Sequence, residues 1–301
     1  EARKKKEPSG FRLFLPSPLQ GSGIIQMTTT DSDYPSKLPT FFLSHGGGPL
    51  PLLGKDPPLA KHLSGLGKLL QKRGGYTSIL VVSAHWEEKV PTLQITPDPS
   101  LYFDYYGFPK ETYEYKYPCK PATKAAKRAH KLLNDAGIET ADNKKRGYDH
   151  GMFVPLMLMF PHTIDVPVSQ ISLVNTLNAK EHWKIGEALA PLREEGVLLI
   201  GSGMSYHGFF QKLPRGVSMA TASKSFDNYL SGTLLELTGA KREEALCDWE
   251  KGQYARVSHP REEHLIPLMV VAGAAKDEQA TRIFHTGEKS GLVVSAYQFG
   301  E

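Results

Sequence analysis

Short apolar runs alternate with longer amphipathic segments over most of the chain. The runs are rich in β-branched residues and predict strands at residues 40–44, 78–83, 167–173, 197–200 and 292–296. Apolar residues at helical spacing predict helices at residues 122–134, 179–192, 221–237 and 261–275. Gly137 follows the first of these helices, where a left-handed residue commonly ends a helix.

Several predicted strands are continuously hydrophobic, as expected for a sheet covered by helices on both faces. The alternation of strands and helices predicts a single α/β domain with a central, mostly parallel sheet flanked by helices. In such a sheet the active site lies at the C-terminal ends of the strands. The aromatic, turn-rich stretch at residues 101–118 predicts a long ordered loop of the kind that serves a site.

The composition is that of an ordinary globular protein, with 301 residues of which 40% are hydrophobic and 23% charged. The net charge of +4 comes largely from the basic run at residues 3–6, and no basic stripe with interleaved aromatics follows. We therefore expect no nucleic-acid partner. No run of 18 apolar residues occurs, so we expect no membrane span. Cys119 and Cys247 form no spaced metal pattern, which favours free thiols in a reducing compartment.

The first 37 residues combine Pro, Gly and Ser with basic side chains. We interpret residues 1–37 as an extension, tag or disordered segment, and residues 38–301 as the folded domain. A cytoplasmic location is expected. Organelle targeting by the extension stays open, although Glu1 and Glu7 disfavour it.

The histidines carry the clearest chemical signal. His45 directly follows the predicted strand at 40–44, His85 closely follows 78–83, and His207 lies beyond the strand at 197–200. Because the carboxyl ends of parallel strands share one edge of a sheet, we expect these imidazoles to converge. Neutral imidazole is a common ligand of zinc and iron. The pattern predicts a mononuclear metal site, with His45 and His85 as its first ligands.

Two further histidines belong with these three. His150 precedes an apolar stretch at 152–160. His264 falls in the predicted helix at 261–275, and Pro260 suits the first helical position. We therefore expect His264 on the early turns of that helix, with Glu262 and Glu263 as nearby carboxylate candidates.

Other motifs are weaker. The glycines at 46–48 lack the Lys and Ser/Thr of a phosphate-binding loop, and residues 201–203 do not meet the GxSxG pattern of a serine hydrolase. His259 stays open as a site residue. We expect surface or packing roles for the remaining histidines, which are His62, His130, His162, His182 and His285.

Taken together, six segments of the chain resemble the class III extradiol ring-cleavage dioxygenases, and within them the 4,5-DOPA extradiol dioxygenase-like family. In chain order these segments are SHGGGP, SAHWE, DYYGFP with YEYKYP, DHGMFVPL, GSGMSYHGF and REEHLIPL. The resemblance extends from about Pro39 to residues 293–297. It implies that 38–301 is a catalytic domain that holds one divalent metal, Fe(II) in active enzymes and often Zn(II) in isolated members.

The resemblance also implies roles for individual residues. His45 and His85 are expected to bind the metal, with His264 as the third ligand and Glu263 as the fallback. His207 matches the acid/base of distant relatives and is also a possible fourth ligand. His150 matches a substrate-contacting residue and is the second candidate for the acid/base. Tyr106 in the aromatic loop is expected to contact the substrate. Residues 204–206 depart from the family, which often has an Asn there.

The expected reaction is cleavage of the aromatic ring of a catechol, DOPA-like or caffeate-like, with O2 as the second substrate. Histidine suits the acid/base role because its ordinary pKa lies near 6.5. A non-catalytic metal-binding or signalling protein of the same fold and a zinc-dependent hydrolase are the alternatives. The native metal and the choice of 4,5 or 2,3 cleavage stay open. We expect a monomer or a small homo-oligomer.

Overall fold

The computed structural model describes residues 37–161, 164–209, 211–287 and 291–301, and the described residues from 37 onward form one compact unit. Almost all of the predicted extension at 1–37 lies outside these ranges, as does His162, for which a surface or packing role is predicted. No helix in the described ranges is long and apolar enough to cross a membrane.

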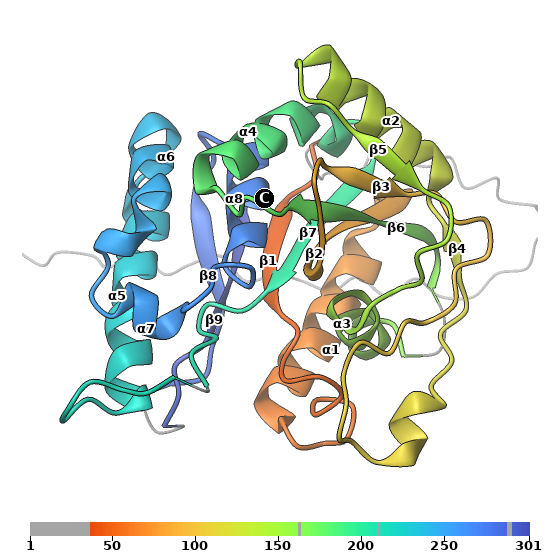
Figure 1. Ribbon diagram of the computed structural model, residues 1–301. Helices are drawn as coiled ribbons and strands as arrows, with labels where there is room; N and C mark the ends of the chain where they lie inside the picture. The colour runs from red at the N-terminus through yellow and green to blue at the C-terminus, as the bar shows by residue number, and fades with distance from the viewer. Residues whose placement is uncertain (1–36, 162–163, 210, 288–290) are drawn as a thin grey trace, which may run out of the picture. The chain divides into compact units, whose positions relative to one another are not determined.

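A nine-stranded sheet runs through this unit, as counted over the described residues (Figure 1). The strand order is β5-β3-β6-β2-β7-β1-β9-β8, and β4 pairs with β6 beside this path. The strands are β1 Thr40–Ser44, β2 Ser78–Glu88, β3 Thr92–Gln94, β4 Cys119–Pro121, β5 Ala141–Asn143, β6 Ile164–Val174, β7 Val197–Gly203, β8 Ala280–His285 and β9 Ser295–Phe299. The central strands β6, β2, β7 and β1 are parallel, whereas β9 is antiparallel to β1 and to β8.

Helices cover both faces of the sheet (Figure 1). They are α1 Pro57–Arg73, α2 Thr123–Asp135, α3 His150–Met159, α4 Ala179–Leu189, α5 Met219–Glu236, α6 Gly239–Cys247, α7 Ala255–Ser258 and α8 Ile266–Ala275, with short 3₁₀ helices η1 Lys110–Tyr113, η2 Ala190–Arg193 and η3 Trp249–Lys251. Alternate strand residues face opposite sides. Phe41 and Ile79 pack in the core formed with α1 and α3, whereas Phe42 and Leu80 pack in the core formed with α2, α4 and α8.

The predicted single α/β domain with a mostly parallel central sheet is confirmed, and three boundaries are corrected. Strand β2 continues beyond residue 83 to Glu88, so His85 lies within the strand and not past its end. The strand predicted at 292–296 begins only at Ser295. The helix predicted at 261–275 begins at Ile266, so His264 precedes the helix and Pro267, not Pro260, occupies its first turn.

The late start of α8 has a backbone cause. The Met204 N–H donates to the carbonyl of His264 (2.9 Å), and the His207 N–H donates to the carbonyl of Ser258 (2.8 Å). The His264 carbonyl, which a helix starting at residue 261 would use, is thus bound to the chain that follows β7, and the carbonyl at the end of α7 is bound there too. Residues 259–264, between α7 and α8, therefore lie alongside that chain as an irregular segment, which places His264 next to the end of β7.

Candidate metal centre

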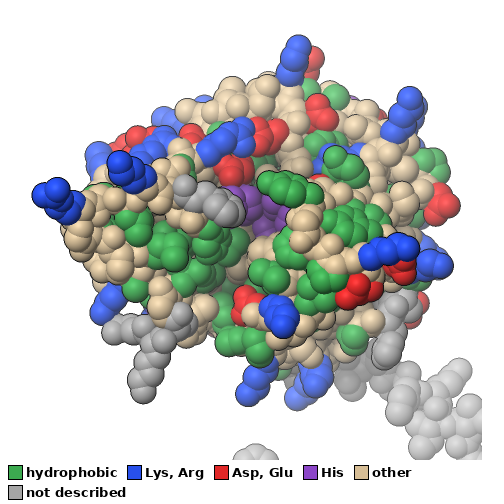
Figure 2. Space-filling view, turned by 60° about the horizontal axis from the view of Figure 1, so that its bottom comes forward, with side chains coloured by type: hydrophobic (Ala, Val, Ile, Leu, Met, Phe, Trp, Pro, Cys, Tyr) green, Lys and Arg blue, Asp and Glu red, His purple; other side chains and the backbone are tan. Residues whose placement is uncertain are grey.

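Five histidines from different parts of the fold lie together near the C-terminal ends of β1, β2 and β7. His45 follows β1, His85 lies in β2, His150 begins α3, His207 follows β7 and His264 precedes α8. In the space-filling view, histidine side chains form the floor of a hollow between apolar and acidic side chains (Figure 2). His45, His150 and His264 are buried, whereas His85 and His207 are half-buried.

Two glycines allow the close approach of the segments that carry these histidines. A Cβ atom on Gly203 would lie 2.1 Å from the carbonyl oxygen of His264. A Cβ atom on Gly151 would lie 2.7 Å from Ser83 Oγ and 3.2 Å from the His85 ring. Any side chain at either position would therefore push the segment before α8 or the start of α3 away from the cluster.

Three Nε2 atoms meet at the centre of the cluster. His85 Nε2 lies 3.1 Å from His45 Nε2 and 3.2 Å from His264 Nε2. On the far side of its ring, His45 Nδ1 lies 3.0 Å from Ser202 Oγ. The Ser202 hydroxyl donates its own proton to the carbonyl of Gly151, so it accepts from His45. The proton of neutral His45 therefore sits on Nδ1 and leaves a lone pair on Nε2.

The rings of His264 and His85 also have a hydrogen-bond acceptor facing Nδ1. His264 Nδ1 lies 3.0 Å from Glu263 Oε1, and His85 Nδ1 lies 3.3 Å from Asp104 Oδ2. Ionised carboxylates only accept hydrogen bonds, so both Nδ1 atoms carry the proton. Three Nε2 lone pairs consequently face one another with no proton between them. A divalent cation bound at Nε2 fits this arrangement, because ligand histidines usually donate their other N–H to a carboxylate or hydroxyl group.

The protonation states also suit metal binding. Burial is the largest cause that lowers the pKa of His45 and His264 well below the ordinary 6.5, followed by the nearby histidines. Burial likewise lowers the pKa of His85 to about 4. All three imidazoles are therefore neutral at pH 7, which is the form that binds a metal.

Among the described residues, two groups of potential metal donors have all their donor atoms within 4.8 Å of one another. One group is His45, His85 and His150, and the other is His207, Glu263 and His264. The structure therefore brings His150, predicted to contact substrate, within reach of a metal on His45 and His85. The predicted triad takes His45 and His85 from one group and His264 from the other.

Asp104 is a site residue that the sequence reasoning missed. Its Oδ1 accepts hydrogen bonds from His150 Nδ1 (2.8 Å) and from the His150 backbone N–H (3.0 Å). Burial raises the pKa of the Asp104 carboxyl, but the bonds from His150 and the charges of His150 and His85 outweigh burial and lower its pKa overall. The only sequence signal was its place at the start of the DYYGFP segment.

Asp149 is a second missed residue, fully buried beneath the cluster. It caps the N-terminus of α3 and accepts hydrogen bonds from Ser83 Oγ (2.7 Å), Arg146 (2.8 Å) and Gln170 (2.8 Å). The same Arg146 nitrogen donates to the His85 carbonyl (2.9 Å). Asp149 thus ties the helix that carries His150 to the strand that carries His85. An Asp before an apolar run is a helix N-cap signal that could have identified it.

Replacing Asp149 with alanine is expected to lower the free energy of unfolding by about 3–5 kcal/mol, because it removes the buried carboxylate that pairs with half-buried Arg146 and accepts from Ser83 and Gln170. Urea unfolding of the metal-free protein measures this change. The matched control is Asp135→Ala, which removes an exposed pair with Lys131 and should change stability by about 0.5 kcal/mol or less. A loss below about 1 kcal/mol for Asp149→Ala would contradict the assigned role.

The remaining predicted residues lie outside the cluster. Tyr106 is 91% exposed, whereas the ring of its neighbour Tyr105 lies 5.7 Å from His150. A substrate contact by Tyr106 stays a prediction. His259 is buried, and its Nε2 lies 3.0 Å from the carbonyl oxygen of Ser205. His182 packs in the core and accepts from the Val174 backbone N–H (3.0 Å).

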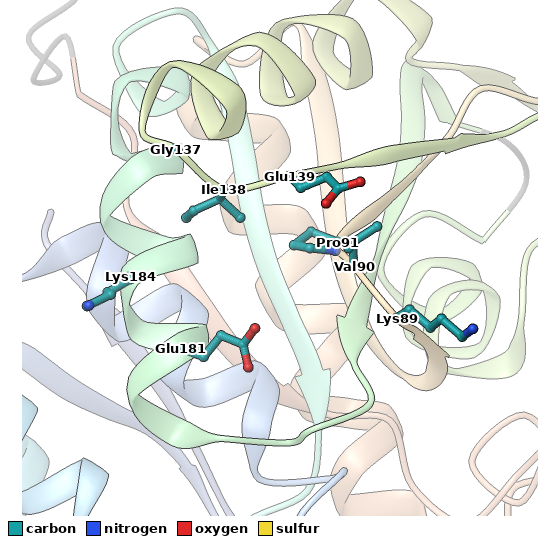
Figure 3. A pocket seen from close by; sticks show the side chains of 8 residues that line it. All are labelled: Lys89, Val90, Pro91, Gly137, Ile138, Glu139, Glu181 and Lys184. Atoms are coloured by element: carbon teal, nitrogen blue, oxygen red, sulfur yellow. The ribbon is translucent and has the colours of Figure 1, made fainter.

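A separate hollow of about 290 Å³ involves none of these histidines. Its lining comes from the chain after β2, the chain after α2 and the first turns of α4, and consists of Lys89, Val90, Pro91, Gly137, Ile138, Glu139, Glu181 and Lys184 (Figure 3). Its lysine and glutamate side chains give it no single sign of charge, so it presents no convergent chemistry.

A histidine cluster at the C-terminal edge of this sheet is compatible with a metal-dependent enzyme of the ring-opening type. Residues 40–300 match the family model described as the catalytic LigB subunit of aromatic ring-opening dioxygenase. The chain belongs to this family of aromatic ring-opening dioxygenases, the class III extradiol family that the sequence resembles, and that prediction is confirmed. Such enzymes act on a small aromatic substrate and dioxygen.

Individual relatives are similar over most of the chain. The chain is 36% identical over 263 residues to a 4,5-DOPA dioxygenase extradiol of Beta vulgaris, covering 86% of this chain and 96% of the relative. It is 32% identical over 283 residues to Dioxygenase tasH of Hapsidospora irregularis, covering 87% and 85%. The crystal structure of an uncharacterized protein from Escherichia coli K12 has a TM-score of 0.67 at 26% identity, covering 88% of this chain and all of that one.

Proposed function

We propose that this protein is an extradiol dioxygenase that opens the ring of a catechol, DOPA-like or caffeate-like, with dioxygen. One divalent metal, Fe(II) in the active enzyme, is bound by the Nε2 atoms of His45, His85 and His264. The observation that carries the proposal is the contact of these three Nε2 atoms, at 3.1 and 3.2 Å, with no proton to share between them. The similarity to relatives named 4,5-DOPA dioxygenase extradiol supports the substrate class.

His264 is preferred over His150 as the third ligand because of its geometry. The lone pair of His264 Nε2 faces His85 Nε2 at 3.2 Å, and Glu263 holds its Nδ1. The His150 ring instead lies against the His85 ring, with centroids 3.9 Å apart. His150 is therefore placed beside the ligands, where it can contact a bound substrate.

When bound, the metal supplies Lewis acidity that lowers the pKa of the catechol oxygens and, as iron, the redox chemistry that dioxygen requires. The protein must then hold and move a proton. His207 Nδ1 faces Glu263 (3.4 Å), so its Nε2 is free to accept a proton from a catechol hydroxyl group and return it later. The adjacent carboxylate stabilises the imidazolium that this transfer creates. His207 is the preferred acid/base, and His150 is the second candidate.

Ser202→Ala is expected to weaken metal binding by about 10–100-fold, because His45 loses the acceptor that holds its proton on Nδ1. Competition with a chromophoric zinc chelator measures the dissociation constant. Ser64→Ala on α1, a helix that carries none of the five clustered histidines, is the matched control and should leave the constant unchanged. An unchanged constant for Ser202→Ala would show that the hydroxyl group does not orient His45.

The proposed function is tested by loading the metal-free protein with Fe(II) under anaerobic conditions and then adding oxygen with L-DOPA or caffeate. We expect a yellow ring-opened product, with one O2 consumed for each ring opened. Zn(II)-loaded protein should bind the catechol without turnover. A protein that is inert with every catechol after iron loading, yet binds zinc tightly, would instead support a non-catalytic metal-binding protein or a zinc hydrolase.

A further inference from the structure

Two carboxylates of the cluster each contact two histidines. Asp104 Oδ1 lies 2.8 Å from His150 Nδ1, and Asp104 Oδ2 lies 3.3 Å from His85 Nδ1. On the other side, Glu263 Oε1 lies 3.0 Å from His264 Nδ1 and 3.4 Å from His207 Nδ1. Both carboxylates are largely buried, with side chains 10% and 15% exposed.

The rings joined by each carboxylate also lie against one another. The His85 and His150 centroids are 3.9 Å apart, and the His207 and His264 rings stack at 3.5 Å with an interplanar angle of 15°. Each pair combines one proposed ligand with one histidine proposed to handle substrate or a proton. The third proposed ligand, His45, has Ser202 as its Nδ1 partner in place of a carboxylate.

We infer that Asp104 and Glu263 are positioning residues. Each sets the tautomer of two histidines at the same time: a proposed ligand and the histidine packed against it, which we call the outer histidine. The ligand and outer histidines are His85 and His150 at Asp104, and His264 and His207 at Glu263. This inference rests on the proposed function, which assigns the roles of metal ligand and of substrate or proton handling to these histidines. A carboxylate that accepts from both Nδ1–H groups leaves both Nε2 atoms of a pair without a proton. The Nε2 of the ligand is then available to the metal and the Nε2 of the outer histidine to the substrate.

The arrangement requires a carboxylate and not an amide. Two Nδ1–H donors need two acceptor sites, and an ionised carboxylate has about four of these, whereas an amide also carries an NH2 group that can only donate. In Asp104→Asn the amide nitrogen must face the Nδ1 of His85 or of His150. In Glu263→Gln the amide oxygen can take the place of Oε1, which faces both Nδ1 atoms, only if the NH2 group takes the place of Oε2, where the donor Arg261 Nη1 lies 3.6 Å away. In the flipped amide the NH2 group faces both Nδ1–H groups instead. Each substitution therefore disturbs its own pair.

The two pairs should respond independently. Asp104 comes from the loop before η1, and Glu263 comes from the segment before α8, so the carboxylates have no backbone connection within the cluster. A change at one carboxylate should leave the other pair intact. We call this result the cross pattern: each carboxylate variant alters its own pair of histidines and leaves the other pair unchanged. The cross pattern distinguishes positioning of individual tautomers from a general loss of structure.

The test is long-range ¹H–¹⁵N NMR of histidine-labelled, Zn(II)-loaded full-length protein, which reports the tautomer of each imidazole. For Asp104→Asn we expect altered signals from both His85 and His150, with His207 and His264 unchanged. For Glu263→Gln we expect the reverse. The matched controls are Asp135→Asn and Glu195→Gln, which alter exposed ion pairs with Lys131 and Arg128 and should change none of the four. Asp104→Glu and Glu263→Asp keep two acceptor oxygens and should restore the wild-type tautomers.

Zinc affinity is the second readout, and both amide variants should weaken it by about 10–100-fold. The inference is overturned if an amide variant alters only the ligand histidine of its pair, or alters all four histidines alike. Neither readout needs turnover. If the wild type opens no catechol but the amide variants show the cross pattern, only the proposed function is rejected. If the wild type opens a catechol but the amide variants lack the cross pattern, only this inference is rejected.

Discussion

His45→Ala is expected to abolish stoichiometric metal binding and, with it, all ring-opening activity. His45 is fully buried, and its Nε2 lies 3.1 Å from that of His85, so alanine removes one of the three proposed ligands. Elemental analysis after loading with one equivalent of Fe(II) or Zn(II) measures the metal content. We expect near one metal per chain in the wild type and close to none in the variant.

The control for His45→Ala is His285→Ala, which removes an exposed histidine on β8 that contacts Ser295. This variant should keep its metal, which separates loss of a ligand from loss of any imidazole. If His45→Ala retained one metal per chain, His45 would not be a ligand and the proposed site would have to be abandoned.

His207→Ala is expected to keep the metal and to lower kcat with a catechol by about 10²–10⁴-fold, the range for loss of a general acid/base. The ring is half-buried and stacks on His264 at 3.5 Å, beside the proposed ligands. Steady-state oxygen uptake by the iron-loaded variant measures kcat, and elemental analysis of the same sample measures the metal. Metal loss in parallel with activity would make His207 a ligand, the alternative role that the family resemblance allows.

The convergence of the strand histidines could be predicted from the sequence because parallel strands place their carboxyl ends at one edge. His45 and His207 follow β1 and β7, and β7 lies between β1 and β2 in the sheet. The exact setting of His85 could not be predicted. After a register shift, β2 resumes pairing with β6 through Glu87 and Glu88, and such pairing depends on a distant strand and not on local pattern.

Features set by tertiary contact escaped the sequence reasoning. Helix α3 is buried on nearly every side, so it has no amphipathic period and appeared only as an apolar stretch. The start of α8 depends on hydrogen bonds from residues after β7, which no local pattern records. Asp104 reaches His85 and His150 from a distant aromatic loop, and a lone Asp in such a loop looks like a turn residue.

A crystal structure of the Fe(II)- or Zn(II)-loaded protein with anomalous data at the metal edge would show whether His45, His85 and His264 hold one metal through Nε2. We expect a single anomalous peak about 2.0–2.2 Å from the Nε2 atoms of these three residues. His150 and His207 should lie outside bonding distance with their Nδ1 atoms on Asp104 and Glu263. A peak bound by His45, His85 and His150, with His264 unbound, would rule out His264 as the third ligand.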